Sequence, residues 1–398
     1  MAIVVQKFGG SSVADVERIG RVADRVARTR GEGKQVVVVV SAMGDTTDDL
    51  LSLARKVCDN PARRELDMLL TAGERISMAL LSMALNARGV PAVSFTGSQS
   101  GIITTDTHAN ARIVEVRPFR VQEELANGKV VIVAGYQGVS QRKEVTTLGR
   151  GGSDTTAVAL AAALGAEACE IYSDVEGVYT ADPRLVTDAK RIAEISYEEM
   201  QELAESGAKV LHAQAVEWAK EKGIAIHARS TFGGAGETVI RPLDPERGGG
   251  TGRIVGVTSE RDLALLFASP GTAAALAELL EHLDARGSFG KQLLFDRLPS
   301  GAASLVLSKE NLPDYGALVA ELGERFGGGV TVREGVGAVS VIGAGINASF
   351  ANVRKVQAVL GGLGAEPLQL STSSFRVSVL LEERHLPEAV RALHAALV

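Results

Sequence analysis

Five consecutive valines, Val36 to Val40, are the feature that most restricts how this chain can fold. Side chains along a strand point alternately to opposite faces, so such a run needs an apolar cover on both faces. Parallel sheets with helices on both sides provide that cover. The valine run therefore predicts a central strand of an α/β domain.

The first 230 residues alternate short β-branched runs with longer helical patterns. Strands are predicted at residues 3–6, 35–41, 90–95, 129–134, 167–173 and 224–229. Helices are predicted at residues 13–30, 47–57, 65–87, 118–127, 154–164 and 213–222. This order predicts an α/β fold with a largely parallel sheet sandwiched by helices.

The composition changes at residues 241–252, where two prolines and four glycines predict a linker. Beyond the linker, two units follow each other in a βαββ order. Their first strands are predicted at 263–267 and 339–342, their helices at 272–285 and 352–363, and their last strands at 293–298 and 373–381. Each unit is too small to cover its own sheet, so we expect the two to pair or to dimerise. One mixed α/β lobe without a repeat is the alternative.

Composition argues against several classes of protein. The net charge is −6 with both signs interspersed, and aromatic residues make up 4%, which disfavours nucleic-acid binding. No uncharged apolar run reaches the roughly 18 residues of a membrane span, and residues 2–5 resemble a strand rather than a signal peptide. A cytoplasmic protein is expected. Cys58 and Cys169 are the only cysteines, and both are predicted to pack as small apolar residues.

The first glycine motif, Lys7-Phe8-Gly9-Gly10-Ser11-Ser12-Val13, follows a predicted strand and precedes a predicted helix. Adjacent glycines let backbone N–H groups approach an anion, and a helix start adds positive dipole character. Lys7 adds a full charge at the same point. The lysine precedes the glycines, so this is not a Walker A loop. The motif predicts a phosphate-binding loop, with a plain strand-to-helix turn as the alternative.

The second motif, at residues 147–156, has the sequence TLGRGGSDTT. Ser153 or Asp154 is predicted to cap the following helix. Capping does not explain Arg150, whose guanidinium between glycines suits a carboxylate ligand. Asp154 beside a phosphate site needs a cation, either a lysine or Mg²⁺.

A third motif, at residues 172–184, leaves a strand for a turn-rich loop. Open α/β sheets bind ligands at the carboxyl ends of their strands, although an ordinary hairpin would have a similar sequence. The three motifs together predict two facing anion sites at one sheet edge. That arrangement suits phosphoryl transfer between two anionic reactants.

These motifs, with SAMGDTTDDLL, TAGERIS and STSSFRVSVL, resemble the aspartate kinase family, which joins an amino-acid kinase fold to tandem C-terminal ACT domains. The resemblance implies ATP-dependent phosphorylation of L-aspartate to 4-phospho-L-aspartate, the first step towards lysine, threonine and methionine. It implies a kinase domain at residues 1–240, a linker at 241–252, a first ferredoxin-like ACT unit at 261–334 and a second built from 253–260 and 335–398.

The resemblance also implies roles for individual residues. Lys7 and Asp154 would be catalytic, with Mg²⁺ carried by ATP and organised by Asp154. ATP would be bound by Lys7, Phe8, Gly9, Gly10, Ser41, Ser173, Asp174, Tyr179, Asp182, Arg184 and Lys209. L-Aspartate would be bound by Thr47, Glu74, Arg150, Gly151, Gly152 and Ser153, with Glu74 on its amino group. No general base is required, because the aspartate carboxylate is ionised at neutral pH. Glu74 as an exposed helix charge and Tyr179 as a turn aromatic are the alternatives.

The sequence departs from the family in three places. Residues 212–216 read HAQAV instead of HPRAV, so we expect an altered nucleotide affinity. Residues 286–291 and 364–367 lack the usual Gly-Ile-Asn effector pattern, which leaves inhibition by lysine or threonine open.

Neither His108 nor His212 has a partner at metal-ligand spacing, so loop or cap roles are expected.

No Met follows Met200, so an AUG start in the linker cannot produce a separate regulatory subunit, whereas a start at another codon is the alternative. A homodimer, or a tetramer built from one, is expected. The alternatives are another amino-acid kinase of the same fold and a non-catalytic, amino-acid-sensing ACT protein.

Overall fold

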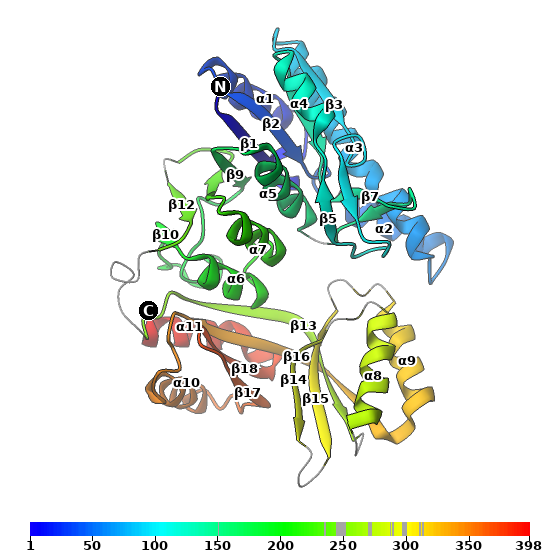
Figure 1. Ribbon diagram of the computed structural model, residues 1–398. Coiled ribbons are helices and arrows are strands. Elements are labelled where there is room, and N and C mark those ends of the chain that lie inside the picture. Colours follow the sequence, from blue (N-terminus) through cyan, green and yellow to red (C-terminus); the bar gives the residue numbers. More distant parts are fainter. Residues whose placement is uncertain are drawn as a thin grey trace. The chain divides into compact units, whose positions relative to one another are not determined.

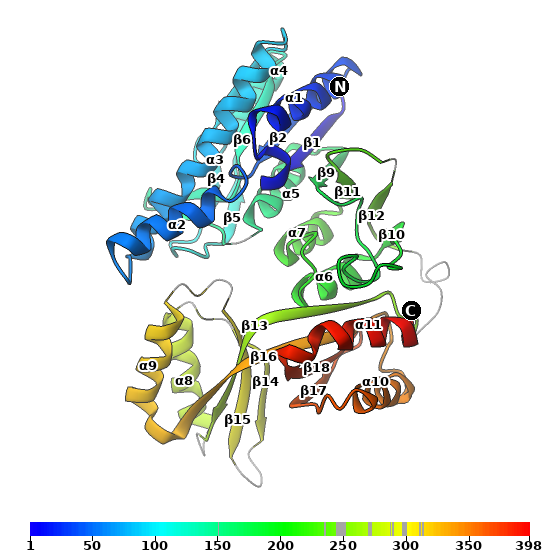
Figure 2. The same cartoon turned by 180° about the vertical axis from the view of Figure 1, so that it is seen from behind.

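The computed structural model describes residues 1–149, 151–234, 236–243, 252–269, 273–286, 288, 290–296, 301–309, 312 and 314–398. The chain forms two compact units, shown from two sides in Figures 1 and 2. The first comprises Met1–Tyr179, Arg191–Glu205 and Lys209–Gly248, and the second comprises Thr180–Lys190, Ser206–Ala208 and Gly249–Val398.

Eight described strands of the first unit form one sheet in the order β10-β12-β11-β9-β1-β2-β6-β3. They are β1 (Ile3–Phe8), β2 (Gln35–Val40), β3 (Ala92–Phe95), β6 (Val130–Ala134), β9 (Ala168–Ser173), β10 (Glu194–Ile195), β11 (Ile226–Ser230) and β12 (Glu237–Ile240). Neighbouring strands are parallel, except that β11 and β12 are antiparallel. The prediction of a largely parallel sheet is confirmed.

Helices cover both faces of this sheet, as the valine run requires (Figure 1). The described helices of the first unit are α1 (Val16–Gly31), α2 (Thr46–Val57), α3 (Arg63–Asn86), α4 (Phe119–Ala126), α5 (Gly152–Leu164), α6 (Tyr197–Glu205) and α7 (Ala213–Lys222), of which α2 packs on α3 and has no buried residue. Val36, Val38 and Val40 pack into one core with residues of α1 and α3. Val39 points to the other face, where it lies near Gly135. All five valines are fully buried.

A small second sheet of the first unit was not predicted from the sequence. Its strands are β4 (Ile102–Thr104), β5 (Ile113–Val116), β7 (Gln137–Ser140) and β8 (Val145–Thr147), in the order β5-β4-β7-β8. Thr104 and Thr146 share a buried hydrogen bond of 2.6 Å across it. Strands of three or four residues are too short to display a clear alternation of apolar and polar positions.

The second unit contains one antiparallel sheet in the order β14-β15-β13-β16-β18-β17. Its elements are β13 (Gly256–Ala268), α8 (Ala273–Ala285), β14 (Gly290–Asp296), β15 (Ala302–Ser308), α9 (Tyr315–Phe326), β16 (Val330–Ile342), α10 (Ala351–Gly362), β17 (Gln369–Thr372), β18 (Arg376–Glu382) and α11 (Leu386–Leu397).

The predicted βαββ repeat is confirmed in this unit. The order β13-α8-β14-β15 recurs as β16-α10-β17-β18, and the sheet order is mirrored about the β13–β16 pair. The two repeats therefore pair through their first strands within one sheet, which ACT units would do. Most of the predicted linker, residues 244–251, lies outside the described residues. The domain boundaries assigned from the sequence remain predictions.

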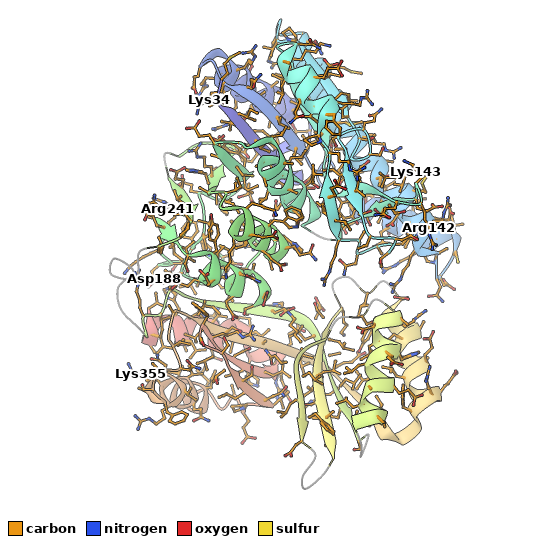
Figure 3. All side chains as sticks on the ribbon, in the orientation of Figure 1. Lys34, Arg142, Lys143, Asp188, Arg241 and Lys355 are labelled. Carbon is orange, nitrogen blue, oxygen red and sulfur yellow. The ribbon has the colours of Figure 1, made fainter. Side chains whose placement is uncertain are left out.

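Helix α3 is long and apolar enough to cross a membrane by length and composition, but half of the relevant window is buried inside the structure. Its buried face also carries two acids, Asp67 and Glu74. This pattern is typical of a core helix. Charged side chains of both signs project from separate surface elements, such as Arg142 and Lys143 at the β7–β8 turn and Asp188 in the second unit (Figure 3).

Candidate active site

The site is built around an ion pair between Lys7 of β1 and Asp154 in the first turn of α5. Lys7 Nζ lies 2.7 Å from Asp154 Oδ1, and the two side chains are 12% and 8% exposed. Strand alternation explains the direction of Lys7, because its neighbour Gln6 points to the α1 face and bonds Thr29. Asp154 Oδ2 accepts a hydrogen bond of 3.2 Å from the backbone N–H of His212. The structure thus joins the two residues predicted to be catalytic.

The glycine loop after β1 packs backbone to backbone against the loop after β2. A side chain on Gly10 would lie 3.0 Å from the carbonyl oxygen of Ala42, so only glycine fits without adjustment. Gly44 N–H donates to the Gly10 carbonyl at 3.1 Å, and Ser41 N–H donates to the Phe8 carbonyl at 3.1 Å. Lys7 Nζ lies above this loop, 3.6 Å from where a Gly9 side chain would begin.

Two details of this loop differ from the prediction. Residues Gly10–Val13 form a single 3₁₀ turn, and α1 begins only at Val16, where Asp15 caps it. Helix α1 therefore does not begin at the glycine pair, and Lys7 is a positive group that lies beside it. Phe8 is fully buried and its ring stacks on Tyr172 with centroids 4.8 Å apart. Its side chain belongs to the core, so only its backbone can meet a nucleotide.

Glu74 is buried on the inner face of α3, so the alternative of an exposed helix charge is wrong. It is 3% exposed, and its Oε1 accepts a hydrogen bond of 3.2 Å from Ala42 N–H. Its Oε2 is buried without a hydrogen-bond partner among the described residues. Burial raises the pKa of Glu74 to about 7, although hydrogen bonds from backbone groups oppose the shift. An unsatisfied, buried carboxylate oxygen is a strong acceptor for a cationic ligand.

Gly73 allows α3 to approach the loop after β2, where the Ala42 N–H donates to Glu74. A side chain on Gly73 would lie 2.8 Å from the Ala42 side chain. Gly73→Ala is therefore expected to destabilise the protein by about 1–3 kcal/mol through overpacking. Ala42→Gly in the same chain removes the clash and should restore part of that loss. Urea denaturation of the wild type, Gly73→Ala and the double variant tests this, and equal stability of the single and double variants would contradict the expected clash.

The glycines before α5 are also needed for close packing. Gly151 has φ of 73° and lies against His212, where a side chain would come within 2.7 Å of the imidazole. Gly151 occupies the N-cap position, so the prediction that Ser153 or Asp154 caps α5 is wrong. Ser153 is buried against Gly135 instead. Arg150 lies outside the described residues.

The remaining predicted residues lie in more open positions. Thr47 is half-buried in the first turn of α2, and Asp174 and Lys209 are exposed. Ser173 ends β9, and its hydroxyl bonds the backbone of Val175 within its own turn. Tyr179 is half-buried and forms a β-bridge with Arg191. Asp182 and Arg184 belong to the second unit and pair with each other at 2.8 Å.

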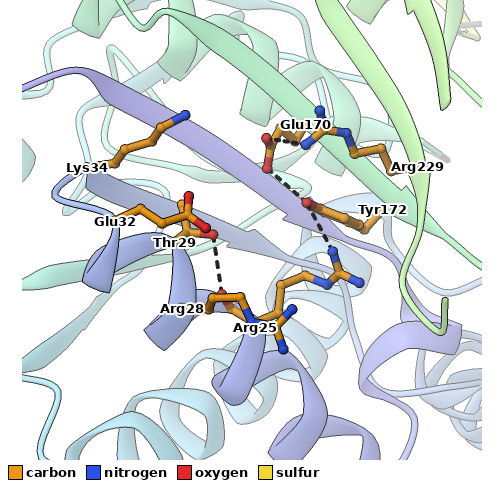
Figure 4. A pocket seen from close by; sticks show the side chains of 8 residues that line it. All are labelled: Arg25, Arg28, Thr29, Glu32, Lys34, Glu170, Tyr172 and Arg229. Carbon is orange, nitrogen blue, oxygen red and sulfur yellow. Dashed lines mark hydrogen bonds and ion pairs between the residues drawn. The ribbon is translucent and has the colours of Figure 1, made fainter. Parts of the chain in front are cut away.

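A pocket of about 260 Å³ lies between residues of α1 and residues of the sheet (Figure 4). Lys7 points to the other face of the sheet, because its neighbour Gln6 bonds Glu170 of the pocket lining. The pocket is lined by Arg25, Arg28, Thr29, Glu32, Lys34, Glu170, Tyr172 and Arg229. Glu170 accepts hydrogen bonds from Gln6 and Tyr172 and pairs with Arg229. The lining includes none of the predicted site residues. We therefore assign these charges to a network that connects β1, β9 and β11.

The two cysteines differ. Cys58 is exposed, so the prediction that it packs as an apolar residue is wrong, whereas Cys169 is buried as predicted. Burial raises the pKa of the Cys169 thiol, which keeps it unreactive.

Within the described residues no three His, Cys, Asp or Glu side chains gather as metal ligands would.

Sequence reasoning missed Asp67, a buried acid that contacts His108 and the end of β8. Its signal was its spacing, because Asp67 and Glu74 are seven residues apart and so lie two helical turns apart on one face of α3. Two acids on the apolar face of one helix are unusual in a core.

Comparison with known proteins agrees with this geometry. A model described as the amino acid kinase family matches residues 2–230. The chain is 46% identical over 408 residues to an aspartokinase of Mycolicibacterium smegmatis, and the match covers 100% of this chain and 96% of the relative. The structure resembles E. coli aspartokinase III in complex with aspartate and ADP in its R-state, with a TM-score of 0.86, 27% identity and 99% of both chains covered.

The T-state of E. coli aspartokinase III, in complex with lysine and aspartate, is also similar, with a TM-score of 0.70, 26% identity and 99% of both chains covered. The family match spans more than half of the chain, and the identity extends over all of it. This chain therefore belongs to the aspartokinases of the amino acid kinase family.

Proposed function

We propose that this aspartokinase transfers the terminal phosphoryl group of ATP to L-aspartate beside the Lys7–Asp154 ion pair. An oxygen of the aspartate side-chain carboxylate attacks the γ-phosphorus, and the bond to the β–γ bridging oxygen breaks. The products are 4-phospho-L-aspartate and ADP. The observation that carries this proposal is the 2.7 Å contact of Lys7 with Asp154, directly above the Gly9-Gly10 loop.

In this proposal Lys7 stabilises negative charge on the transferring phosphoryl group. Both reactants are anions, so catalysis depends on positioning and charge stabilisation rather than on a base. Asp154 holds the Lys7 ammonium in place and is itself fixed by His212 N–H. Gly9 and Gly10 carry no side chains, so phosphate oxygens can approach the backbone of this loop. The Gly9 N–H itself donates to the Tyr172 carbonyl at 3.2 Å, so other N–H groups of the loop are proposed to face the phosphates.

The other nucleotide contacts are proposed from the family resemblance. They come from Ser41, Ser173, Asp174, Tyr179, Asp182, Arg184, Lys209 and the backbone of Phe8. Mg²⁺ would neutralise phosphate charge when bound with ATP. Asp154 is proposed to be the acid that faces it, and the described residues offer no group of three acids, histidines or cysteines that could hold a metal. The ion is therefore proposed to be held mainly by the phosphates of ATP.

L-Aspartate is proposed to bind with its ammonium on Glu74. The buried Oε2 of Glu74 lacks a partner among the described residues, and an ammonium donor would satisfy it. Thr47, Arg150 and the Gly151-Gly152-Ser153 segment are proposed to bind the two carboxylates. Substrate profiling separates this proposal from another amino-acid kinase, because turnover that prefers glutamate would contradict it. Absence of any ATP turnover would favour the non-catalytic alternative.

The pKa of Glu74 predicts a pH dependence of aspartate binding. Only the ionised carboxylate attracts an ammonium group, and Glu74 ionises at about pH 7 in the free protein. The KM for L-aspartate is therefore expected to fall as the pH rises from 6 to 8 and then to level off. Glu74→Gln removes the titrating group, so its KM should be high and flat over this range. Initial rates at saturating ATP test both curves, and a wild-type KM that does not change with pH would contradict the assignment.

The second unit is the part of this chain to which we assign regulation. E. coli aspartokinase III was solved with lysine in a T-state. We propose that an amino acid, lysine or threonine, binds the second unit of this chain and inhibits it, and that the protein is a cytoplasmic homodimer or a larger homo-oligomer. Assays with lysine, threonine and both together test the inhibition, and unchanged rates in all three would contradict it.

A further inference from the structure

Asp67 is a buried carboxylate that binds two other segments of the first unit, the loop of His108 and Ala109 and the end of β8. It lies on α3 with no exposed surface. His108 Nδ1 lies 2.7 Å from Asp67 Oδ2, and Thr147 Oγ1 donates to Asp67 Oδ1 at 2.5 Å. The backbone N–H of Ala109 donates to both carboxylate oxygens, at 3.1 and 3.2 Å. We call these four residues the Asp67 clamp.

The clamp holds a loop in a strained shape. Ala109 has φ of 67°, in the left-handed region that non-glycine residues rarely adopt. The N–H of Ala109 donates hydrogen bonds to the Asp67 carboxylate, and these bonds offset the cost of the strained backbone. Burial raises the pKa of Asp67, whereas the bonds from Thr147, His108 and Ala109 lower it. Removing Asp67 alone would leave the Ala109 N–H and the Thr147 hydroxyl without their acceptor, so the acid maintains this arrangement of the loop and β8.

The clamp connects two parts of the proposed aspartate site. Asp67 precedes Glu74 by two turns on the same face of α3. Thr147 ends β8, and the chain then runs through Leu148 and Gly149 towards the start of α5. The loop that contains His108 also bonds this segment directly, because Ala111 N–H donates to the Thr147 carbonyl at 2.8 Å. Asn110 Oδ1 lies 2.9 Å from where a Gly149 side chain would begin.

We propose that Asp67 is a positioning residue for L-aspartate. Through His108, Ala109 and Thr147 it fixes the separation between Glu74, proposed to bind the ammonium, and the segment before α5, proposed to bind the carboxylates. The inference rests on the proposed function, since it assumes that L-aspartate spans these two parts. Asp67 itself does not touch substrate. Loss of the clamp should therefore weaken aspartate binding and leave the nucleotide side unaffected.

Two substitutions test the proposal. Asp67→Asn keeps the shape, but its amide group cannot accept the bonds of His108, Ala109 and Thr147 together. Thr147→Val removes one hydroxyl at nearly equal volume. Both are expected to raise the KM for L-aspartate, by about 10–100-fold in Asp67→Asn and less in Thr147→Val, as lost supporting contacts do at other sites. The KM for ATP should stay within about threefold of wild type, because the variants leave Lys7 and its loop intact.

Matched variants separate positioning from stability. Thr147→Ser keeps the hydroxyl and should restore a nearly wild-type KM for L-aspartate. Thr104→Val breaks the buried Thr104–Thr146 bond of the same small sheet and should lower the melting temperature without changing that KM. If Asp67→Asn does not fold, the comparison of Thr147→Val with Thr147→Ser decides the question alone.

The proposal is overturned if Asp67→Asn and Thr147→Val behave like Thr104→Val, with reduced stability and an unchanged KM for L-aspartate. Failure of the proposed function is a different result. In that case the wild-type chain would show no ADP formation that depends on L-aspartate, whatever the variants do.

Discussion

Replacing Lys7 with methionine is expected to lower kcat by about 10²–10³-fold, the usual effect of removing one group that stabilises transition-state charge. Methionine fills a similar volume, so the β1 strand and the core behind it should be retained. The ammonium that faces Asp154 at 2.7 Å is lost, however, and no other described side chain is paired with Asp154 there. Steady-state kinetics with saturating ATP and L-aspartate measures the effect.

The same substitution should also cost stability. Breaking an ion pair whose members are 12% and 8% exposed leaves the Asp154 charge buried, and such losses amount to about 3–5 kcal/mol. Because the His212 N–H still donates to Asp154, we expect the loss of stability to lie near the lower end of this range. Adding Asp154→Asn removes the uncompensated charge. The double variant should therefore regain stability in urea denaturation and remain inactive. Recovery of activity in the double variant would contradict the role of Lys7.

Glu74→Gln is expected to reduce kcat/KM for L-aspartate by about 10²–10³-fold, as truncating one partner of a buried, hydrogen-bonded charge pair costs roughly 2–5 kcal/mol. The neutral amide loses the attraction to the substrate ammonium. The KM for ATP should change little, since Glu74 contacts the β2 loop through Ala42 and not the glycine pair.

Stability should move in the opposite direction in this variant. The folded-state pKa of Glu74, about 7, lies above the ordinary value of 4.5 that the unfolded chain has. The folded protein therefore keeps a proton that the unfolded chain has released, and stability falls as the pH rises through this interval. At pH 8 Glu74→Gln removes this cost, so the free energy of unfolding should rise by about 1–3 kcal/mol.

Glu65→Gln is the matched control for Glu74→Gln. Glu65 lies on the same helix, is exposed and pairs only with Arg64 among the described contacts. Exposed pairs contribute about 0–1 kcal/mol, so both kinetics and stability should stay close to wild type. Glu74→Gln with wild-type KM for L-aspartate would show that the substrate ammonium binds elsewhere.

The sequence predicted the parts of the fold that depend on strong local patterns. The valine run of β2 and the apolar strands β1, β6 and β9 allowed the parallel sheet to be inferred, because residues buried on both faces leave a continuous apolar signal. The need of Asp154 for a cationic partner was inferred from charge alone, since an acid beside phosphates needs a cation. The structure supplies Lys7 as that cation.

Other features depend on contacts that a single sequence does not reveal. The strands β4, β5, β7 and β8 have only three or four residues each. Asp67 acquires its partners from residues about 40 and 80 positions away. The 3₁₀ turn after Gly9 and the N-cap position of Gly151 follow from close backbone packing, which local propensity does not encode.

The most direct test of the account is to measure ADP and acyl phosphate together. Purified protein is incubated with ATP, Mg²⁺ and L-aspartate, and the product is trapped with hydroxylamine as the aspartyl hydroxamate. We predict one hydroxamate for each ADP in the wild type, and the loss of both in Lys7→Met while L-aspartate still binds in calorimetry. ADP formation that is equally fast without L-aspartate, or in Lys7→Met, would contradict transfer at the Lys7–Asp154 pair.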